Sequence, residues 1–281
     1  MPEGDYTTFF LNSALAKGNP LAPLSLLFLF MARFLPIIAL APFFGSRVLP
    51  HPVKVCFALV MFVVLLPHLL TMTTTPLTFN LELVVLFMKE LFIGFIMGFM
   101  ISLPFNIVQN AGIIIDHQRG GASLMVNDPT IQNQSSPLGT LFNMVLIYMF
   151  FVIDGPFIFL NAVINSYEII PPDKFFSTDF FLQGSAFWDQ QIKILNKVMI
   201  MSVQLASPAL LAILMTDAFL GIANRLAPQV QITCLGMPLK SLLGLTVVCI
   251  GWKLFNEEVI KQTYIWMNSI ETMLKMFKVV S

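Results

Sequence analysis

The chain has 281 residues, of which 57% are hydrophobic and 11% are charged. Soluble domains carry about 25% charged residues, so lipid or other proteins must cover much of this chain. Its fifteen basic and fifteen acidic side chains cancel to a net charge of zero, whereas a nucleic-acid-binding module needs a basic face. The composition therefore excludes nucleic acid as a partner and favours a membrane-associated protein.

Six long apolar stretches divide the sequence. Each is close to or longer than the ~20 residues that a helix needs to cross a bilayer, and such stretches cross hydrocarbon as helices. The acidic start, MPEGDYTTFF, lacks the basic region of a cleaved signal peptide, so we expect an uncleaved chain. We predict an all-α, membrane-associated fold of about six long helices in one domain, residues 1–281. The stretches are residues 21–44, 53–70, 81–108, 138–170, 192–222 and 232–255.

Ionisable residues interrupt every one of these stretches. Such groups are costly at membrane depth and usually face protein or a water-filled cavity, so the helices should pack mostly against protein. The turn sequence Asp154-Gly155-Pro156 also breaks the fourth stretch into a helical hairpin. A plain bundle of six spans is therefore not expected. The interrupting residues are Arg33, Lys54, Lys89, Glu90, Asp154, Asp217 and Lys240.

The residues that usually carry chemistry are scattered. The three histidines lie in no H-E-x-x-H pattern, and no G-x-S-x-G nucleophile motif is present in the sequence. Cys56, Cys234 and Cys249 lie in apolar stretches, and an odd number there argues against a disulfide framework. We expect three buried cysteines, no catalytic residue, no metal or other cofactor, and no enzymatic activity.

Two patterns favour helix packing or contact with a partner. Glu90, Gly94 and Gly98 repeat every four residues on one helix face, and small residues at that spacing let another backbone approach closely. The second pattern is the polar segment 221–241, which fits either a tight connector or a partner contact. Its candidate contact residues are Asn224, Arg225, Pro228, Gln229 and Lys240.

Several motifs, spread along most of the chain in a fixed order, carry a resemblance to one family. They are Arg33-Phe34-Leu35-Pro36, Pro42-x-x-Gly45, SRVLPHPVK (46–54), Glu90-x3-Gly94-x3-Gly98, AGIIIDHQRG (111–120), Asp128-Pro129, Asp154-Gly155 and NRLAPQVQITCLGMPLK (224–240). With these motifs the chain resembles the T component of the type III secretion export apparatus, which is equivalent to the R component of the flagellar export gate. The variants RFLP, SPAL and NRLAPQVQ favour the virulence injectisome branch.

The resemblance implies a non-enzymatic subunit of a narrow channel in the bacterial inner membrane, with part of the assembly raised above the bilayer. Its implied partners are the P-type and Q-type small apolar subunits, the switch and large gate proteins, and unfolded secreted proteins. The resemblance also assigns residues 109–129 to a plug-like loop, with three glycines as hinges and the isoleucines as blocking surface. The assigned plug residues are Gly112, Ile113, Ile114, Ile115, Asp116, Gln118, Arg119, Gly120 and Gly121.

Arg119 and Gln231 depart from the family pattern. An apolar residue is expected in place of Arg119, and Asn is more usual in place of Gln231. If the segment is locally helical, Arg119 can pair with Asp116 three residues earlier.

Two other functions fit parts of the sequence. A small-solute transporter would use Arg33, Asp154 and Asp217 at a midplane binding site, although the sequence shows no convincing inverted repeat. A purely structural scaffold would lose assembly, and not its seal, when the 109–129 segment is changed.

Overall fold

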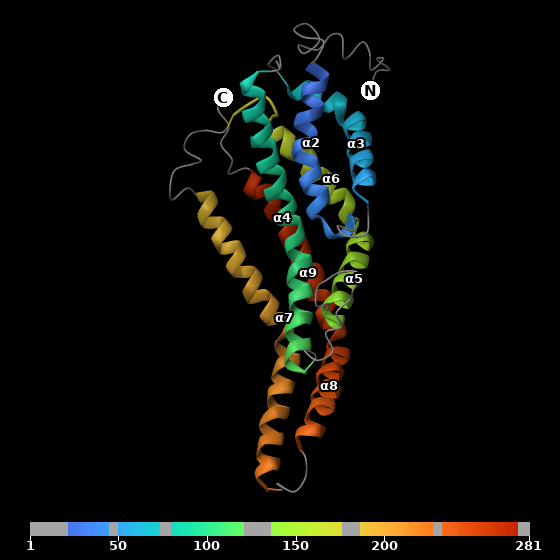
Figure 1. The fold of residues 1–281 in the computed structure, drawn as a ribbon, viewed down its shortest axis with the longest axis vertical. Coiled ribbons are helices and arrows are strands. Elements are labelled where there is room, and N and C mark those ends of the chain that lie inside the picture. The colour runs from blue at the N-terminus through green and yellow to red at the C-terminus, as the bar shows by residue number, and fades with distance from the viewer. Residues whose placement is uncertain are drawn as a thin grey trace. The chain divides into compact units, whose positions relative to one another are not determined.

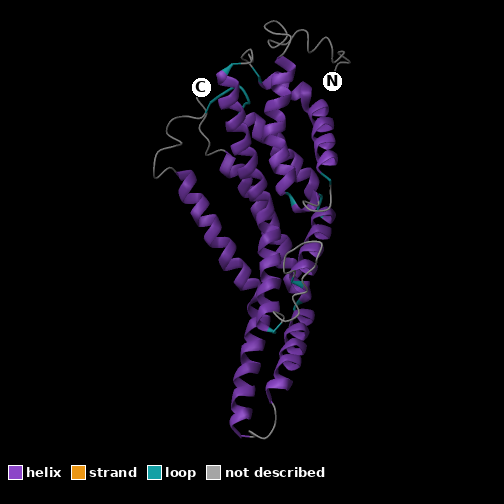
Figure 2. Ribbon diagram, viewed as in Figure 1, coloured by secondary structure: helices purple, strands orange, loops and turns teal. Residues whose placement is uncertain are grey.

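The computed structural model describes residues 22–44, 50–73, 80–120, 136–175, 186–226 and 232–274, and these residues are helical or in short connections. Figure 1 shows the helices coloured in chain order, and Figure 2 shows the described elements as helices, so the predicted all-α class is confirmed. The elements are α2 (Ala22–Leu40), η1 (Pro42–Phe44), α3 (His51–Met72), α4 (Leu81–Gln118), α5 (Pro137–Val152), α6 (Gly155–Ile169), α7 (Ala186–Leu226), α8 (Ile232–Ile250) and α9 (Trp252–Leu274).

Four described helices are long and apolar enough to cross a membrane: α2, α3, α4 and α7. The broken pairs α5–α6 and α8–α9 raise the number of candidate spans in the described residues to six if each pair counts as one. Helices α4 and α7 contain 38 and 41 residues. At a rise of about 1.5 Å per residue, both are much longer than a hydrocarbon core of about 30 Å, so part of each must lie outside it.

The break between α5 and α6 lies where the turn sequence predicted it. Asp154 has a φ of 57° in the left-handed region, which few residues other than glycine adopt. Pro156 then occupies the first turn of α6, where proline's fixed φ and missing N–H are tolerated. The second break was not predicted: Gly251 separates α8 from α9, and the helices there are bent by 63°.

The chain divides into two compact units. The first contains Met1–Ser102, Asp154–Gln191 and Ile265–Ser281, and the second contains Leu103–Ile153 and Ile192–Tyr264. In the first unit, the ring of Phe30 stacks on Phe34 and on Tyr167 at centroid distances of 5.1 and 5.8 Å. In the second unit, Phe142 packs against Phe255 at 4.6 Å. Each unit therefore has its own aromatic core.

Three predictions about the chain's elements were wrong. Helix α4 does not end near residue 108 but continues to Gln118, so the first half of the predicted 109–129 loop is helical. The stretch 232–255 is two helices, and α9 continues to Leu274 through a mixed apolar and charged sequence. Cys56 and Cys249 are exposed and not buried, because the helices that carry them turn apolar faces away from the chain's own core.

Candidate functional site

Arg33 of α2 is the centre of a buried charge cluster in the first unit. Its guanidinium pairs with the Glu90 carboxylate of α4 through two N–H groups, one of which donates to Oε1 at 2.8 Å. It also donates to Ser166 Oγ at 3.1 Å and to the carbonyl oxygen of Ile170 at 2.8 Å. Both charged side chains are fully buried, and the guanidinium lies 4.0 Å from the Tyr167 ring centroid. The rigid fork of an arginine suits such a two-oxygen contact.

Lys89 extends this cluster to the chain that follows α6. Its ammonium donates to the carbonyl oxygens of Pro171, Pro172 and Lys174 at 2.9, 3.2 and 2.8 Å. It lies 2.8 Å from Glu90 Oε1 as well. Carbonyl groups after a helix end have no partner within the helix, so Lys89 and Arg33 together satisfy the backbone that leaves α6.

The face formed by Glu90, Gly94 and Gly98 lies against α2 of the same chain. A Cβ added at Gly94 would lie 2.9 Å from the carbonyl carbon of Arg33, and one added at Gly98 would lie 2.9 Å from the carbonyl oxygen of Pro36. Glycine therefore allows the two helix backbones to touch. In the described residues this face makes an intrachain helix contact.

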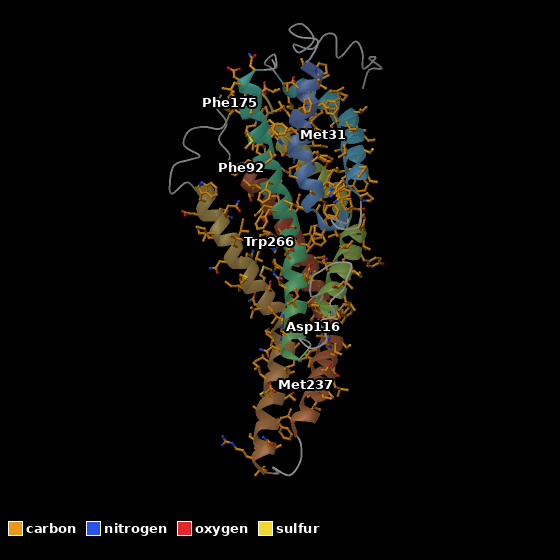
Figure 3. All side chains as sticks on the ribbon, in the orientation of Figure 1. Met31, Phe92, Asp116, Phe175, Met237 and Trp266 are labelled. Carbon is orange, nitrogen blue, oxygen red and sulfur yellow. The ribbon has the colours of Figure 1, made fainter. Side chains whose placement is uncertain are left out.

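Asp116, near the C-terminal end of α4, is the centre of a second cluster, in the second unit (Figure 3). The residue is 1% exposed. Oδ2 accepts hydrogen bonds from the Ser136 hydroxyl and from the Leu138 N–H, the latter at 3.0 Å. Oδ1 accepts from Arg119 Nε at 2.8 Å, and Arg119 Nη2 lies 2.6 Å away. The pairing predicted from the i, i+3 spacing is therefore confirmed.

Two glycines in this region have different roles. Gly112 lies within α4, and a Cβ there would lie 2.5 Å from the backbone nitrogen and Cα of Gly139 on α5. Gly112 is therefore a close contact between α4 and α5 in this structure. Gly120 follows the helix with a φ of 87°, and its N–H donates to the carbonyl oxygen of His117. A left-handed glycine of this kind ends a helix.

The remaining predicted plug residues lie at different depths. Ile115 is 2% exposed, Ile113 and Ile114 are partly buried, and Gln118 is exposed. Ile115 packs within its own unit, so it offers no free blocking surface. Gly121 lies outside the described residues, as does the rest of the predicted plug to residue 129.

The structure describes three of the five residues predicted for partner contact near 221–241. Asn224 and Arg225 are exposed in the last turn of α7. Lys240 of α8 forms an ion pair with Asp217 of α7, which ties the two helices together. Pro228 and Gln229 lie outside the described residues.

The three residues proposed for a transporter site have other surroundings. Arg33 is occupied by Glu90, Ser166 and a backbone carbonyl. Asp217 is paired with Lys240, and Asp154 is exposed at the turn before α6. Among the described residues, no group of three His, Cys, Asp or Glu side chains is placed to hold a metal ion.

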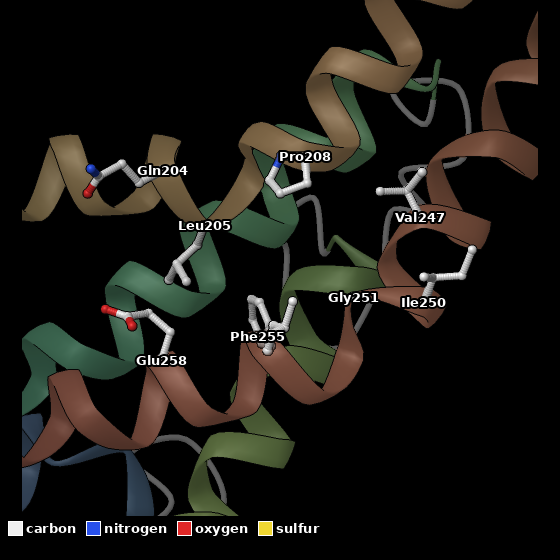
Figure 4. A pocket seen from close by; sticks show the side chains of 9 residues that line it. Gln204, Leu205, Pro208, Val247, Ile250, Gly251, Phe255 and Glu258 are labelled. Carbon is white, nitrogen blue, oxygen red and sulfur yellow. The ribbon is translucent and has the colours of Figure 1, made fainter.

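A pocket of about 340 Å³ lies in the second unit, beside Pro208 inside α7 and beside Gly251, which separates α8 from α9 (Figure 4). Leu205, Val247 and Phe255 supply much of its apolar lining. Two polar side chains, Gln204 and Glu258, also line it, and both residues are exposed. The pocket therefore offers apolar surface, with no buried polar group arranged for catalysis.

Sequence reasoning missed the groups that complete both clusters. Ser166 and the carbonyls after α6 have no sequence signature, because they become acceptors through tertiary packing alone. Ser136 had one: Ser followed by Pro137 is typical of a helix start, with serine as N-cap and proline in the first turn. In the structure Ser136 Oγ accepts from the Gly139 N–H at 3.0 Å.

Comparison with known proteins gives consistent matches. The family described as bacterial export proteins, family 1, matches residues 24–264. The chain is 32% identical to Yop proteins translocation protein T of Yersinia pestis over 163 residues, 58% of this chain and 60% of that protein. It is 31% identical to secretion system apparatus protein SsaT of Salmonella typhimurium over 165 residues, 58% and 61% of the two chains. It is 25% identical to flagellar biosynthetic protein FliR of Escherichia coli over 229 residues, 80% and 83%. The first two matches thus span about 60% of those relatives' lengths.

Proposed function

Because the chain belongs to family 1 of the bacterial export proteins, we propose that it is a channel-forming subunit of a type III protein export gate. It helps to gate the passage of unfolded proteins across the bacterial inner membrane. The family match is the observation that carries this proposal. Relatives named for translocation, secretion apparatus and flagellar biosynthesis support it.

The proposed partners are the P-type and Q-type apolar subunits of the gate, together with its switch and large gate proteins. Exposed apolar surface on the described helices supports the need for partners or lipid. Val60 and Val63 of α3 are 60% and 63% exposed, and Met215 and Phe219 of α7 are 73% and 68% exposed. Large apolar side chains that are this exposed gain free energy when lipid or another protein covers them.

We assign the plug role to the residues that follow Gly120 in the 109–129 segment. Residues 109–118 belong to α4, and Gly112, Ile115 and Asp116 are held in the second unit by packing or hydrogen bonds. The end of α4 therefore serves as a fixed base for the plug.

Deleting residues 124–128 in the assembled secretion complex tests the proposal. We expect a higher ion leak through resting inner membranes, because the barrier is shortened while its base is kept. Deletion of residues 178–182, an equally long piece of another connection, is the control and should leave the seal intact. A tight membrane in assembled complexes that carry the 124–128 deletion would contradict a gating role.

The transporter alternative makes a different prediction. A transporter should be stable when purified alone or as a homo-oligomer, whereas a gate subunit should need its partner subunits. Arg33 is already paired with Glu90, and Asp217 is already paired with Lys240. Because these pairs leave neither side chain free for a solute, they favour the gate over the transporter. Purification of the chain with and without the co-expressed subunits distinguishes the two.

A further inference from the structure

The carboxylate of Asp116 joins three parts of the second unit. Oδ1 faces Arg119, in the turn that ends α4. Oδ2 faces the start of α5, where it accepts from Ser136 Oγ and from the Leu138 N–H. A buried carboxylate without partners would be strongly unfavourable, and here each oxygen accepts at least two hydrogen bonds or charged contacts. Both carboxylate oxygens of Asp116 are therefore satisfied in this arrangement.

The contact with α5 uses the unpaired groups of a helix start. The first N–H groups of a helix have no partner within it and attract anions. Leu138 donates directly to Asp116, and Gly139 donates to Ser136 Oγ at 3.0 Å while Ser136 itself donates to Asp116. Asp116 thus completes the cap of α5 from a different helix.

Backbone packing places the carboxylate there. Gly112, one turn before Asp116 on the same face of α4, packs closely against Gly139 of α5. A Cβ on Gly139 would in turn lie 2.9 Å from the carbonyl oxygen of Gln109. The two helices touch at their glycines, and Asp116 forms its hydrogen bonds next to that contact, at the start of α5.

Arg119 links the same carboxylate to a third helix. Its Nη1 lies 3.4 Å from Ser241 Oγ on α8, and its side chain is 10% exposed. The guanidinium neutralises Asp116, so the cluster carries no net charge within an apolar unit. An apolar residue at this position would leave the buried carboxylate without its cation.

We propose that Asp116 and Arg119 form a latch that holds the end of α4 against α5 and α8, and so maintains the resting seal of the channel. Both are positioning residues, because they act through the orientation of α4 and not by blocking the passage themselves. The inference rests on the proposed gate function. When the end of α4 separates from α5, the two hydrogen bonds that Asp116 accepts from Ser136 and Leu138 must break. Separation from α8 also breaks the contact between Arg119 and Ser241. Loss of the latch should therefore favour the separated, leaking arrangement.

The test measures resting ion leak and secretion rate in membranes that contain the complete secretion complex. Asp116→Ala should raise the leak about ten- to a hundredfold, as expected for the loss of a charge-assisted hydrogen bond. Arg119→Lys keeps the cation and should restore most of the seal that Arg119→Ala loses. The exchanged pair, Asp116→Arg with Arg119→Asp, should still leak, because arginine cannot accept from the Leu138 N–H. Glu257→Gln is the matched control, since Glu257 is exposed and lies 4.0 Å from Lys253.

Several results would overturn the latch. Assembled Asp116→Ala complexes that stay sealed would do so, and so would an exchanged pair that seals as well as the parent chain. If Asp116→Ala prevents assembly, Ser136→Ala removes one donor to Oδ2 more gently, and an unchanged leak there would also reject the latch. The 124–128 deletion separates this failure from that of the gate. A leaking deletion with sealed latch variants rejects the latch alone, and a sealed deletion rejects the gate as well.

Discussion

Replacing Gly94 by alanine tests the contact between α2 and α4 in the first unit. The added Cβ would lie 2.9 Å from two backbone carbons of Arg33 and closer still to its carbonyl oxygen. Ordinary contacts begin near 3.4 Å, so the helices would have to separate by more than 0.5 Å. Backbone atoms of one helix cannot yield without moving that whole helix, so the strain cannot be relieved by a side-chain rotation.

The cost of Gly94→Ala has two parts. Overpacking of a well-packed contact destabilises by about 1–3 kcal/mol. Because Arg33 moves with its helix, its bonds to Glu90 are also stretched, and breaking such a buried pair outright costs about 3–5 kcal/mol. Alanine regains about 0.5–1 kcal/mol over glycine within a helix. We therefore expect a net loss of about 2–4 kcal/mol in the free energy of unfolding.

Alanine substitutions at two other glycines provide comparisons for the stability loss of Gly94→Ala. Gly98→Ala meets its nearest backbone atoms at 2.9–3.0 Å, so we expect a smaller loss of about 1 kcal/mol. Gly221→Ala, in an exposed part of α7, meets no atom within 4 Å and should be neutral or stabilising by up to about 1 kcal/mol. The assay is unfolding of the purified complete gate complex that carries each variant, in mixed micelles, followed by helical circular dichroism. The difference between variants reports the change in the stability of this chain. If Gly94→Ala were as stable as Gly221→Ala, the backbone contact that we describe would not exist in the protein.

Further predictions concern the two clusters. Glu90→Gln should destabilise the chain by about 3–5 kcal/mol, because the buried Arg33 loses its counter-charge; joint replacement of both by leucine should recover most of that loss in the same unfolding assay. Lys89→Met removes the donor to three carbonyl groups, so limited proteolysis should cut residues 171–175 faster than in the parent chain, and equal rates would contradict this. Gly120→Ala should cost about 1 kcal/mol at its positive φ, whereas Gly120→Asn should cost less. Unfolding measurements that give equal losses would show that Gly120 does not adopt this conformation.

The helices and one of the breaks could be predicted from local sequence. Hydrophobic length identifies the membrane-compatible helices, since apolar stretches near 20 residues have few alternatives to a helix. The break at Asp154 was also local, because Gly155 and Pro156 both disfavour continuation of α5. Gly251 gave no comparable signal, since a lone glycine in an apolar stretch is also tolerated within a membrane helix.

At the end of α4, polar residues led to the wrong prediction of a loop. Gln109, Asn110 and Asp116 look like the residues of a solvated loop, and a loop beginning near residue 109 was expected. Helix α4 nevertheless continues, because Asp116 finds its donors on α5 and in Arg119. Those donors lie 20 or more residues away in sequence or depend on the helix itself. Composition cannot distinguish a carboxylate facing water from one satisfied by another helix.

Helix α4 repeats one arrangement in both units. In the first unit, Glu90 and Gly94 are four residues apart, and in the second, Gly112 and Asp116 have the same spacing. Each glycine touches the backbone of a neighbouring helix, and each acid is paired with an arginine. At each cluster a group near a helix end also takes part: the Ile170 carbonyl accepts from Arg33, and the Leu138 N–H donates to Asp116. Lipid chains are as apolar as leucine, so hydrophobic contact alone does not select one helix pairing over another in a membrane. Close glycine contacts and satisfied buried charges do select it, because a shift of one residue would create a clash and leave an acid without donors. The charges that looked misplaced in the apolar sequence thus specify which helices α4 pairs with, and at what register.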